Sequence, residues 1–325
     1  MVSSTPVVLG LDFGGTKVAA AACDLEGRQV HREVISTQSD QGAEAVLQRG
    51  LDAAGQLLDR LGRPPLAGIG VATIGVPNGR FVELAPAIPG WEAVPLAERV
   101  ADTLGAPVRL ANDVKAAAVA EARWGALAGA DPALYVNLGT GLAAAIVVGG
   151  KVVTGAHGAA GEIGYLLLRP DDLDRSFDER PILEHIVSGM GLAAAGSRRL
   201  ARPVSALEVF SGSDADPALA AVVDEFVAWL ALHLVNLAVA LDPERIAVGG
   251  GFVRSWSRFS VRIEQALKAG VPFPPALVPA RHPYDAALLG ALCLGITAAG
   301  RDLAPDLSLD AAAWSAAAKD EEGLE

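Results

Sequence analysis

The stretch VVLGLDFGGTKVAAAACDLEGRQV, residues 7–30, sets a single carboxylate and a small polar turn into an otherwise apolar run. Short apolar segments bounded by turn residues are typical of β-strands. We therefore predict strands over Val7–Asp12 and Lys17–Cys23, followed by a turn at DLEG and a third strand from Arg28. The three strands are expected to form an antiparallel meander, and Asp12 ends the first of them.

The chain repeats this design near its middle. The stretch ALYVNLGTGLAAAIVVGGKVV, residues 133–153, again contains a strand, a small polar turn, a strand, a tight turn and a strand. Aligned by hand, LDFGGT at 11–16 lies over VNLGTG at 136–141. This internal similarity indicates that each half of the chain begins with the same hairpin.

The segments around these hairpins predict an α/β protein. Apolar residues at helical spacing predict helices over 42–61, 96–104, 114–127, 219–241 and 286–300, and further helices from Ile182. Further strands are predicted over 66–73, 107–113 and 245–251, with a loop over 75–90. A chain of 325 residues exceeds the usual size of one core, so two lobes are expected.

Charge and composition exclude several classes of function. The formal net charge of −12 opposes non-specific binding to nucleic acid, which needs clustered Lys and Arg. The sequence near Met1 lacks the pattern of a signal peptide, and no apolar run is expected to be long enough to span a bilayer. We therefore expect a cytoplasmic protein without nucleic-acid or membrane partners. Cys23 and Cys293, the two cysteines, are expected to be small core residues.

The two small polar turns are candidates for phosphate binding. One such turn alone is most simply a hairpin that needs a positive φ. Two equivalent turns facing each other across a cleft would place backbone N–H groups and the hydroxyls of Thr16 and Thr140 around an anion, such as the phosphates of a nucleotide. Lys17 adds a positive charge there, unless it is simply solvated. The patterns of a P-loop and of a dinucleotide-binding G-x-G-x-x-G turn are both missing from the sequence.

Asp12, at the head of the first turn, has two interpretations. Its carboxylate could satisfy the N–H groups of its own turn. Beside a phosphate cradle it could instead hold Mg²⁺, directly or through water, because Mg²⁺ prefers few carboxylates together with phosphates and waters. The presence of a second, equivalent turn favours the metal role.

Five stretches, in order, resemble the motifs of the ROK sugar kinases of the hexokinase and actin superfamily. They are LDFGGTK, LANDVKAAA, LGTGLAAAIV, GAAGEIGY and AVGGGF, and the resemblance runs from about residue 7 to 300. It implies a glucokinase-like protein with two ribonuclease-H-like lobes, the actin-like ATPase fold, around a central cleft. It also implies ATP and Mg²⁺ at the glycine turns, a hexose in the cleft, and a homodimer.

The same resemblance implies where the lobes divide. The N-terminal lobe is expected at 1–117, completed by the helix at 286–300. The C-terminal lobe is expected at 118–285 and carries the second phosphate turn, the adenosine site and the dimerisation surface. Residues 302–325 are expected to form a tail.

Roles for individual residues follow from the resemblance. Asp113 alone would be a helix N-cap, but a sugar kinase needs a carboxylate on a rigid element as its base, and the resemblance assigns that role to Asp113. The implied sugar contacts are Gly75, Trp91, Asn112, Asp113, Glu162, Tyr165 and Glu184. The implied nucleotide contacts are Asp12, Gly14, Gly15, Thr16, Lys17, Gly139, Thr140, Gly141, Gly249, Gly250 and Gly251.

The chain departs from the family pattern at the zinc site. Most relatives carry a His at the position of Tyr165, followed by a cysteine cluster that binds structural zinc. The segment from Tyr165 through Pro181 contains no cysteine, so no structural zinc is expected. His157, His185 and His282 have no spacing typical of metal ligands and are expected to be surface or hydrogen-bonded residues.

Two more departures concern the sugar. Ala87 stands where relatives usually have a sugar-binding Asn, and Lys115 stands where another Asn is common. Together with Tyr165 they predict an ATP-dependent kinase for a hexose that differs from glucose, such as an amino sugar, an epimer or a cyclitol. The alternative is a non-catalytic sugar sensor or regulator of the family. Its regulators carry an N-terminal helix-turn-helix domain, for which no room is expected before the first strand.

Overall fold

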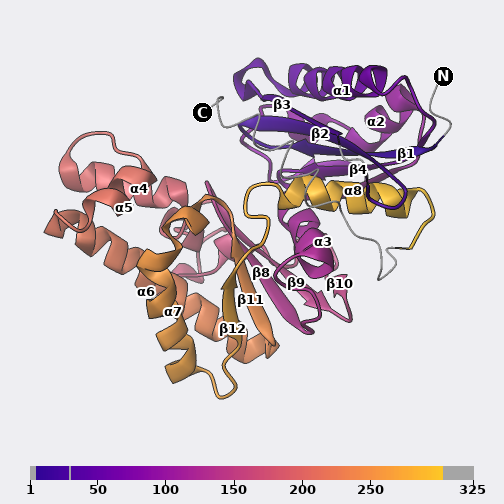
Figure 1. Cartoon of the computed structure of the whole chain (residues 1–325). Coiled ribbons are helices and arrows are strands. Elements are labelled where there is room, and N and C mark those ends of the chain that lie inside the picture. Colours follow the sequence, from indigo (N-terminus) through magenta and orange to yellow (C-terminus); the bar gives the residue numbers. More distant parts are fainter. Residues whose placement is uncertain (1–4, 29–30, 303–325) are drawn as a thin grey trace. The chain divides into compact units, whose positions relative to one another are not determined.

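The structure, a computed structural model, describes residues 5–28 and 31–302 of the chain. The strands form two five-stranded sheets and one small hairpin (Figure 1). The described chain divides into two compact units: unit 1 contains the residues up to Ala120, Thr154–Ala159 and those from Asp285, and unit 2 contains Glu121–Val153 and Ala160–Tyr284. The expected lobe boundaries remain predictions, and the expected tail lies outside the described residues except for residue 302.

The sheet of unit 1 has the strand order β3-β2-β1-β4-β7. Its strands are β1 (Val7–Phe13), β2 (Lys17–Asp24), β3 (His31–Ser36), β4 (Leu66–Thr73) and β7 (Val108–Asn112). β1, β2 and β3 pair antiparallel in chain order, which confirms the predicted meander, and β1, β4 and β7 are parallel. The carboxyl ends of these three parallel strands therefore meet at one edge of the sheet, where Asp12 pairs with Ala72 and Thr73 pairs with Asn112.

Helices cover both faces of this sheet. α1 (Ala43–Arg60) and α2 (Leu96–Leu104) lie on one face, and α8 (Ala286–Ala298) lies on the other (Figure 1). The side chains of β1 alternate between the two faces, since Leu9 and Leu11 join the cluster with α1 while Val8 joins the cluster with α8. α3 (Asp113–Trp124) begins directly after β7. All four helices lie close to the spans predicted from the sequence.

The backbone of α8 lies directly on the backbone of the sheet. A Cβ atom added at Gly70 in β4 would lie 1.8 Å from the carbonyl oxygen of Ala291 in α8. On another side of α8, a Cβ atom added at Gly290 would lie 1.8 Å from the carbonyl oxygen of Ala116 in α3. No side chain fits at such distances, so glycine at these two positions sets how closely β4, α8 and α3 pack.

The sheet of unit 2 has the strand order β10-β9-β8-β11-β12. Its strands are β8 (Ala133–Leu138), β9 (Leu142–Val148), β10 (Lys151–Val152), β11 (Arg245–Gly249) and β12 (Ala276–Pro279). β8, β9 and β10 pair antiparallel in chain order, and β11 and β12 lie parallel to β8. Strand order and pairing are the same as in unit 1, so the repeated hairpin predicted from the sequence is confirmed.

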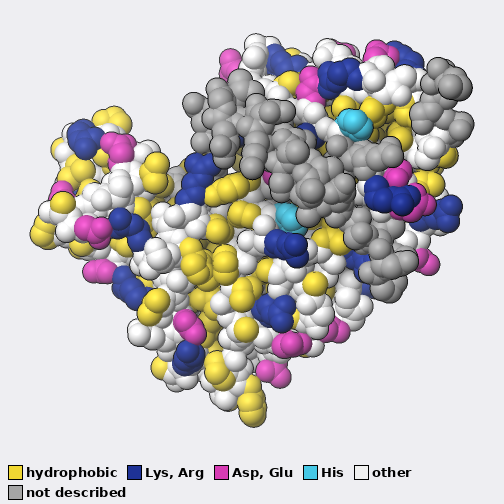
Figure 2. Space-filling model, in the orientation of Figure 1, with side chains coloured by type: hydrophobic (Ala, Val, Ile, Leu, Met, Phe, Trp, Pro, Cys, Tyr) yellow, Lys and Arg dark blue, Asp and Glu magenta, His cyan; other side chains and the backbone are white. Residues whose placement is uncertain are grey.

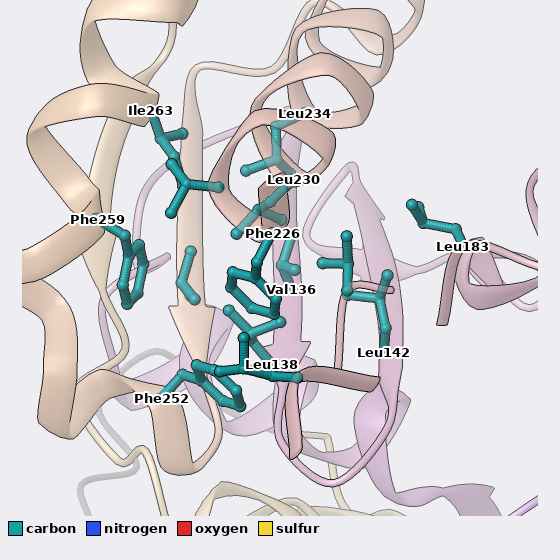
Figure 3. Packing of buried hydrophobic residues seen from close by; sticks show 14 of the residues in the cluster. Val136, Leu138, Leu142, Leu183, Phe226, Leu230, Leu234, Phe252, Phe259 and Ile263 are labelled. Atoms are coloured by element: carbon teal, nitrogen blue, oxygen red, sulfur yellow. The ribbon is translucent and has the colours of Figure 1, made fainter. Parts of the chain in front are cut away.

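The core of unit 2 forms between its sheet and the helices α6 (Pro217–Leu241) and α7 (Trp256–Gly270). Figure 3 shows Phe226 and Leu230 of α6 beside Val136 and Leu138 of β8. The rings of Phe226 and Phe252 stack with their centroids 5.2 Å apart. Offset and stacked aromatic pairs of this kind contribute packing energy beyond the area that they bury.

α6 corrects one expectation from the sequence. With 25 residues it is long and apolar enough to cross a membrane by length and composition, whereas no such run was expected. Its buried residues Leu219, Val223, Phe226, Leu230, Leu234 and Ala238 recur at intervals of three or four residues and belong to the core of unit 2. Burying one face of a helix in this way explains its apolar character without a bilayer, so α6 is a core helix of unit 2.

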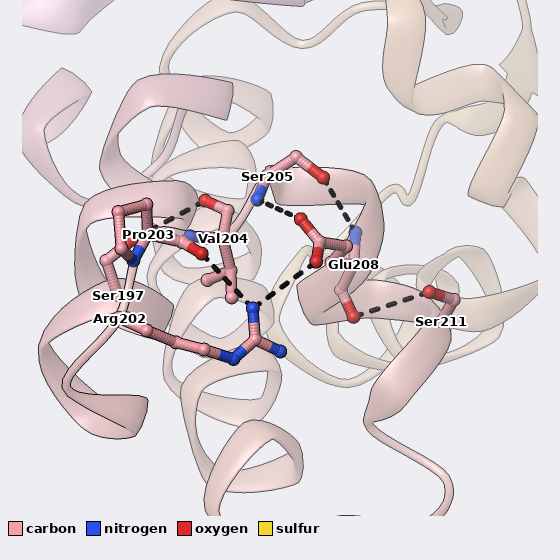
Figure 4. Close-up of polar contacts among 7 residues, drawn as sticks. All are labelled: Ser197, Arg202, Pro203, Val204, Ser205, Glu208 and Ser211. Carbon is pink, nitrogen blue, oxygen red and sulfur yellow. Dashed lines mark hydrogen bonds and ion pairs between the residues drawn. The ribbon is translucent and has the colours of Figure 1, made fainter.

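Between the 3-10 turn at Leu183–His185 and α6 the chain forms two short helices. The helices expected from Ile182 begin as a 3-10 turn at Leu183–His185, followed by α4 (Gly189–Leu200) and α5 (Ala206–Gly212). Ser205 and Glu208 cap α5 reciprocally: the Glu208 N–H donates to Ser205 Oγ and the Ser205 N–H donates to Glu208 Oε2 (Figure 4). Such a capping box satisfies two N–H groups at the start of the helix. Other 3-10 turns lie at Ser39–Gln41, Trp91–Ala93, Ile163–Tyr165, Pro170–Asp172 and Gly251–Ser255.

Four elements were not predicted. The loop expected over 75–90 contains a hairpin of β5 (Val76–Asn78) and β6 (Phe81–Glu83), whose short strands are separated by two residues only. α7 was missed although Phe259, Ile263 and Leu267 are spaced by four residues, which is a helical signal. β12 has four residues and ends in proline, so its sequence alone does not distinguish it from a loop.

The surface carries mixed charges. On the face drawn in Figure 2, the Lys and Arg side chains of the described residues lie among Asp and Glu side chains. Ion pairs such as Arg80–Glu98 and Arg99–Glu44 join exposed side chains on unit 1. Pairs of this kind contribute little stability, but their mixture of signs does not form a basic nucleic-acid footprint on that face.

We expect Gly70→Ala to destabilise unit 1 strongly. The added methyl group would overlap the backbone of α8, so the helix must move off the sheet, at a cost of at least about 1–3 kcal/mol in the free energy of unfolding. The measurement is the midpoint of urea unfolding.

Gly55→Ala in α1 provides the matched control, because a Cβ atom there meets nothing within 4 Å. That change should raise stability by about 0.5–1 kcal/mol, since alanine loses less backbone entropy in a helix. Equal unfolding midpoints for the two variants would contradict the close packing of α8.

Candidate active site

The first polar turn joins β1 to β2 and is fixed from outside. The Gly14 N–H donates to the Lys17 carbonyl at 3.0 Å, and Thr37 binds both ends of the turn through its Oγ1–H to Gly14 O (2.7 Å) and its N–H to Thr16 O (2.9 Å). Within the described ranges, the N–H groups of Gly15 and Thr16 donate to no protein acceptor. The turn therefore keeps backbone donors available for an anion.

The second polar turn, residues 139–141, joins β8 to β9 and is held by α4 and Glu184. The carbonyl groups of Gly139 and Thr140 accept from the N–H groups of Gly189 (2.8 Å) and Met190 (3.2 Å) at the start of α4. Glu184 Oε2 accepts the Leu142 N–H at 2.8 Å. Glu184, expected as a sugar contact, thus also supports the second turn.

Asp12 carries a buried oxygen without a protein partner. Its residue is half-buried, and its Oδ1 is buried and accepts no hydrogen bond from any described residue. Burial, together with the smaller effect of the nearby charges of Asp113 and Asp285, raises the pKa of Asp12 to about 8. An orphaned carboxylate oxygen beside a turn with available N–H groups fits Mg²⁺ bound together with phosphates.

Asn112 and Asp113 lie where β7 ends and α3 begins. Asn112 Oδ1 accepts the Lys115 N–H at 2.8 Å, which is the bond of a helix cap, whereas Asp113 Oδ1 accepts the N–H of its neighbour Val114 at 2.8 Å. The cap expected at Asp113 is therefore supplied by Asn112. Asp113 does not cap α3, so its carboxylate can serve another role at the edge of the sheet where the parallel strands end.

The environment of Asp113 raises its pKa to about 6. Burial is the largest cause, and it is opposed by the backbone N–H groups of Val114 and Asp113 and by the charge of Lys115. The Lys115 side chain is itself buried, with 4% exposed. A carboxylate with a pKa near 6 can accept a proton at neutral pH, as a general base must.

The residues expected from the 75–91 segment take different places. Trp91 is fully buried, its ring packs 5.3 Å from that of Phe13, and its Nε1–H donates to Thr73 Oγ1 at 2.8 Å. This geometry makes Trp91 a support for Thr73 at the end of β4; its direct contact with a sugar stays a prediction.

Gly75 has φ 80°, and a Cβ atom there would lie 2.6 Å from Glu83 O. Ala87 is exposed. Its Cβ atom lies 3.5 Å from the position that a Cβ atom added at Gly15 would take, so Ala87 borders the first turn.

Glu162, Tyr165 and Glu184 lie on neighbouring segments of unit 2. The Tyr165 N–H donates to Glu162 O at 3.2 Å, and a Cβ atom at Gly164 between them would lie 3.2 Å from Glu184 Cβ. The Tyr165 ring contacts Phe177 edge-on, with centroids 6.1 Å apart. The two expected glutamates and the tyrosine are thus brought together, beside the second turn that Glu184 supports.

The Gly249–Gly251 turn follows β11 and packs against the end of β8. Gly250 has φ 84°, and a Cβ atom there would lie 2.4 Å from Leu138 O, so the turn requires glycine at this position. Leu138 immediately precedes the second polar turn. Unit 2 therefore places two of its expected nucleotide segments next to each other.

The segment after Tyr165 is organised by a buried carboxylate. Asp172 is 1% exposed, and Arg169 and Arg175 lie 3.8 Å and 4.0 Å from its oxygens.

Within the described part of the chain, no group of three or more His, Cys, Asp or Glu side chains is placed to hold a metal ion. The absence of zinc remains a prediction.

Sequence reasoning missed two residues beside the first turn. Thr37 fixes the turn from the residue after β3, and Asp285 precedes α8 and forms an ion pair with the buried Arg32 at 3.3 Å. Asp285 also acts on the pKa of Asp12. An Asp directly before an apolar helix was a visible cap signal, but only the fold shows that it faces this site.

Two units, each with a hairpin that carries a small polar turn and each with the same five-stranded sheet, define an actin-like ATPase fold of two ribonuclease-H-like lobes. The fold expected from the sequence is confirmed. A family model described as "ROK family" matches residues 8–298. The chain belongs to the ROK family, and the relationship expected from its motifs is confirmed.

Individual relatives are named for different activities. The chain is 30% identical over 281 residues to a glucokinase of Halalkalibacterium halodurans, covering 80% of this chain and 85% of the relative. It is 31% identical over 291 residues to an N-acetylmannosamine kinase of Yersinia pseudotuberculosis, covering 87% and 96%. A ROK family glucokinase from Streptomyces griseus, solved with glucose and AMPPNP, superposes with a TM-score of 0.75 at 26% identity, covering 90% of this chain and 99% of that one.

We expect Asp113→Asn to stabilise the protein at pH 7. The pKa of about 6 lies above the ordinary value of 3.8, so the folded protein holds this proton more tightly than the unfolded chain. The stability that this proton contributes is present below pH 4 and is lost as the pH rises through 6. Removing the charge should therefore raise the free energy of unfolding by about 2–3 kcal/mol at pH 7 and change it little at pH 4.

Urea unfolding at the two pH values measures this difference. Asp102→Asn, which alters an exposed carboxylate on α2, is the control and should leave both midpoints unchanged. If Asp113→Asn and the unaltered protein unfold at the same urea concentration at pH 7, burial does not disfavour the charge of Asp113.

Proposed function

We propose that the protein is an ATP-dependent phosphotransferase that phosphorylates a hydroxyl group of a hexose or modified hexose, with Asp113 as its catalytic base. The observation that carries this proposal is the position of Asp113. Its half-buried carboxylate, with a raised pKa, follows β7 at the edge of the sheet where Asp12 and the first turn also lie. A general base and a phosphate-binding turn on one rigid sheet are what phosphoryl transfer to an alcohol requires.

In this mechanism the residues of the chain bind and orient the reactants. The N–H groups of Gly15 and Thr16 bind phosphate oxygens, and Asp113 accepts the proton of the attacking hydroxyl group. Asn112, whose side-chain oxygen caps α3, lies next to Asp113 in the sequence and would bind a neighbouring hydroxyl group. Mg²⁺ held near Asp12 supplies positive charge to the phosphates when it is bound.

The relatives support the class of reaction and leave the sugar open. One is a glucokinase, one is an N-acetylmannosamine kinase, and one was solved with glucose and the ATP analogue AMPPNP. We place the remaining nucleotide contacts of this chain at Lys17, at residues 139–141 and at Gly249–Gly251, and the remaining sugar contacts at Gly75, Glu162, Tyr165 and Glu184. We also propose that the protein works in the cytoplasm, forms a homodimer and needs no structural zinc.

The substrate class that we propose is a hexose different from glucose, such as an amino sugar, an epimer or a cyclitol. Ala87 borders the first turn and is exposed, so the short side chain leaves room where a longer one would supply a hydrogen bond. Lys115 places a buried positive charge beside Asp113. Tyr165 offers one hydroxyl on a rigid ring. A site that lacks a hydrogen-bond partner for one hydroxyl group of glucose discriminates against glucose, because that hydroxyl group loses its bond to water and gains none in the site.

We expect ADP release, with ATP and Mg²⁺, to depend on one member of a panel of hexoses, amino hexoses, N-acetylated hexosamines and cyclitols. Asp113→Asn should lower kcat/KM for that sugar by about 10²–10⁴-fold, because an amide cannot accept the proton that the carboxylate takes. Asp102→Asn is the control and should leave the rate unchanged. Tight binding of a sugar without ADP release would instead support the non-catalytic sensor, and glucose exceeding all analogues would contradict the substrate class.

Ala87→Asn should shift the preference toward glucose. The amide would add a donor and an acceptor beside the first turn, and we expect kcat/KM for glucose relative to the preferred sugar to rise by about tenfold. Ala93→Asn, at an exposed position on the same segment, is the control. An unchanged ratio would show that position 87 does not contact the sugar.

A further inference from the structure

Glu121 is a fully buried carboxylate that none of the roles above uses. It lies on α3, eight residues after Asp113, and has 0% of its side chain exposed. It accepts three backbone N–H groups: Oε1 accepts from His282 at 2.7 Å, and Oε2 accepts from Ala126 at 2.6 Å and from Arg281 at 3.1 Å. A buried carboxylate stays ionised at a low cost only where such bonds replace water.

The N–H groups of Arg281 and His282 belong to the segment that follows β12. On one side of this segment, the Ala280 N–H donates to Val248 O of β11 at 2.8 Å. On the other side, Pro283 O accepts the Gly250 N–H at 3.1 Å. Residues 280–283 therefore connect Glu121 to the middle of the Gly249–Gly251 turn through backbone bonds alone.

The Glu121 carboxylate leaves no room for a side chain at position 125. A Cβ atom at Gly125 would lie 2.1 Å from Glu121 Oε2, so a side chain there would displace the carboxylate. Glutamine in place of Glu121 keeps the shape but offers one acceptor oxygen, and its NH₂ group would meet backbone N–H groups. The two oxygens of the Glu121 carboxylate satisfy all three donors at once.

We propose that Glu121 is a positioning residue for the nucleotide: through residues 281–283 it holds the Gly249–Gly251 turn in the form that receives ATP. This inference rests on the proposed function, because it takes that turn as part of the nucleotide site. Glu121 itself touches neither reactant. Its effect is expected on nucleotide affinity and not on the sugar, since its side-chain bonds lead to this turn and to none of the proposed sugar contacts.

The test compares binding of AMPPNP, with Mg²⁺, to the unaltered protein and to Glu121→Gln by calorimetry. We expect Kd for AMPPNP and KM for ATP to rise by about tenfold, with KM for the preferred sugar within about twofold of the unaltered value. Hydrogen exchange should accelerate at residues 249–254 and 280–283. An equal rise in both KM values would indicate a general loss of structure and would overturn the proposal.

Glu208→Gln is the matched control, because Glu208 also accepts a backbone N–H in unit 2 but caps α5 (Figure 4). It should change neither nucleotide affinity nor exchange at 249–254. Gly125→Ala is a second variant that keeps the charge and displaces the carboxylate, and it should reproduce the loss of nucleotide affinity. If Glu121→Gln does not fold, Gly125→Ala decides the question.

The outcomes separate this inference from the proposed function. Failure of the unaltered protein to bind AMPPNP would overturn the kinase proposal, and the positioning role with it. Normal binding by the unaltered protein and unchanged binding by both Glu121→Gln and Gly125→Ala would overturn the positioning role alone.

Discussion

The contact between the backbone of α8 and the sheet of unit 1 is the constraint on which the candidate site depends. Gly70 lets α8 lie against β4, and Gly290 lets α3 lie against α8. Asp285 precedes α8 and Asp113 begins α3, so the same two glycines that set the packing also bring these carboxylates into the electrostatic range of Asp12. A methyl group at either glycine would separate the elements that carry the charges.

Gathering three carboxylates at one edge of a sheet opposes stability. Burial raises the pKa of both Asp12 and Asp113, and the charges of Asp113 and Asp285 add to the rise for Asp12, which means that the charged forms are held at a cost. Arg32, paired with Asp285, and Lys115, near Asp113, offset part of that repulsion. Stored electrostatic strain of this kind is typical of functional sites, where stability is given up for charges that act on a ligand.

Local patterns predicted the elements that build the site. The hairpins around both polar turns, and the helices that cover the first sheet, followed from apolar spacing and turn residues alone. Prediction failed where the signal was short or not used, as in β5, β6, β12 and α7. It also left local roles undecided: the structure shows that Asn112 caps α3 and that the indole of Trp91 is buried against Phe13. Neither outcome is visible in a list of residue types, because each depends on where a neighbouring element lies.

The sequence by itself determined the repeat of two hairpins, the α/β class and the family, because these rest on periodicity and on the order of short motifs. Only the tertiary structure decided which carboxylates share an environment, that Thr37 and Glu184 fix the two turns, and that Glu121 connects α3 to the Gly249–Gly251 turn. The physical reason is that hydrogen bonds and charges act over a few ångströms in space. Residues 121 and 282, far apart in the chain, meet only after both have been placed by packed strands and helices.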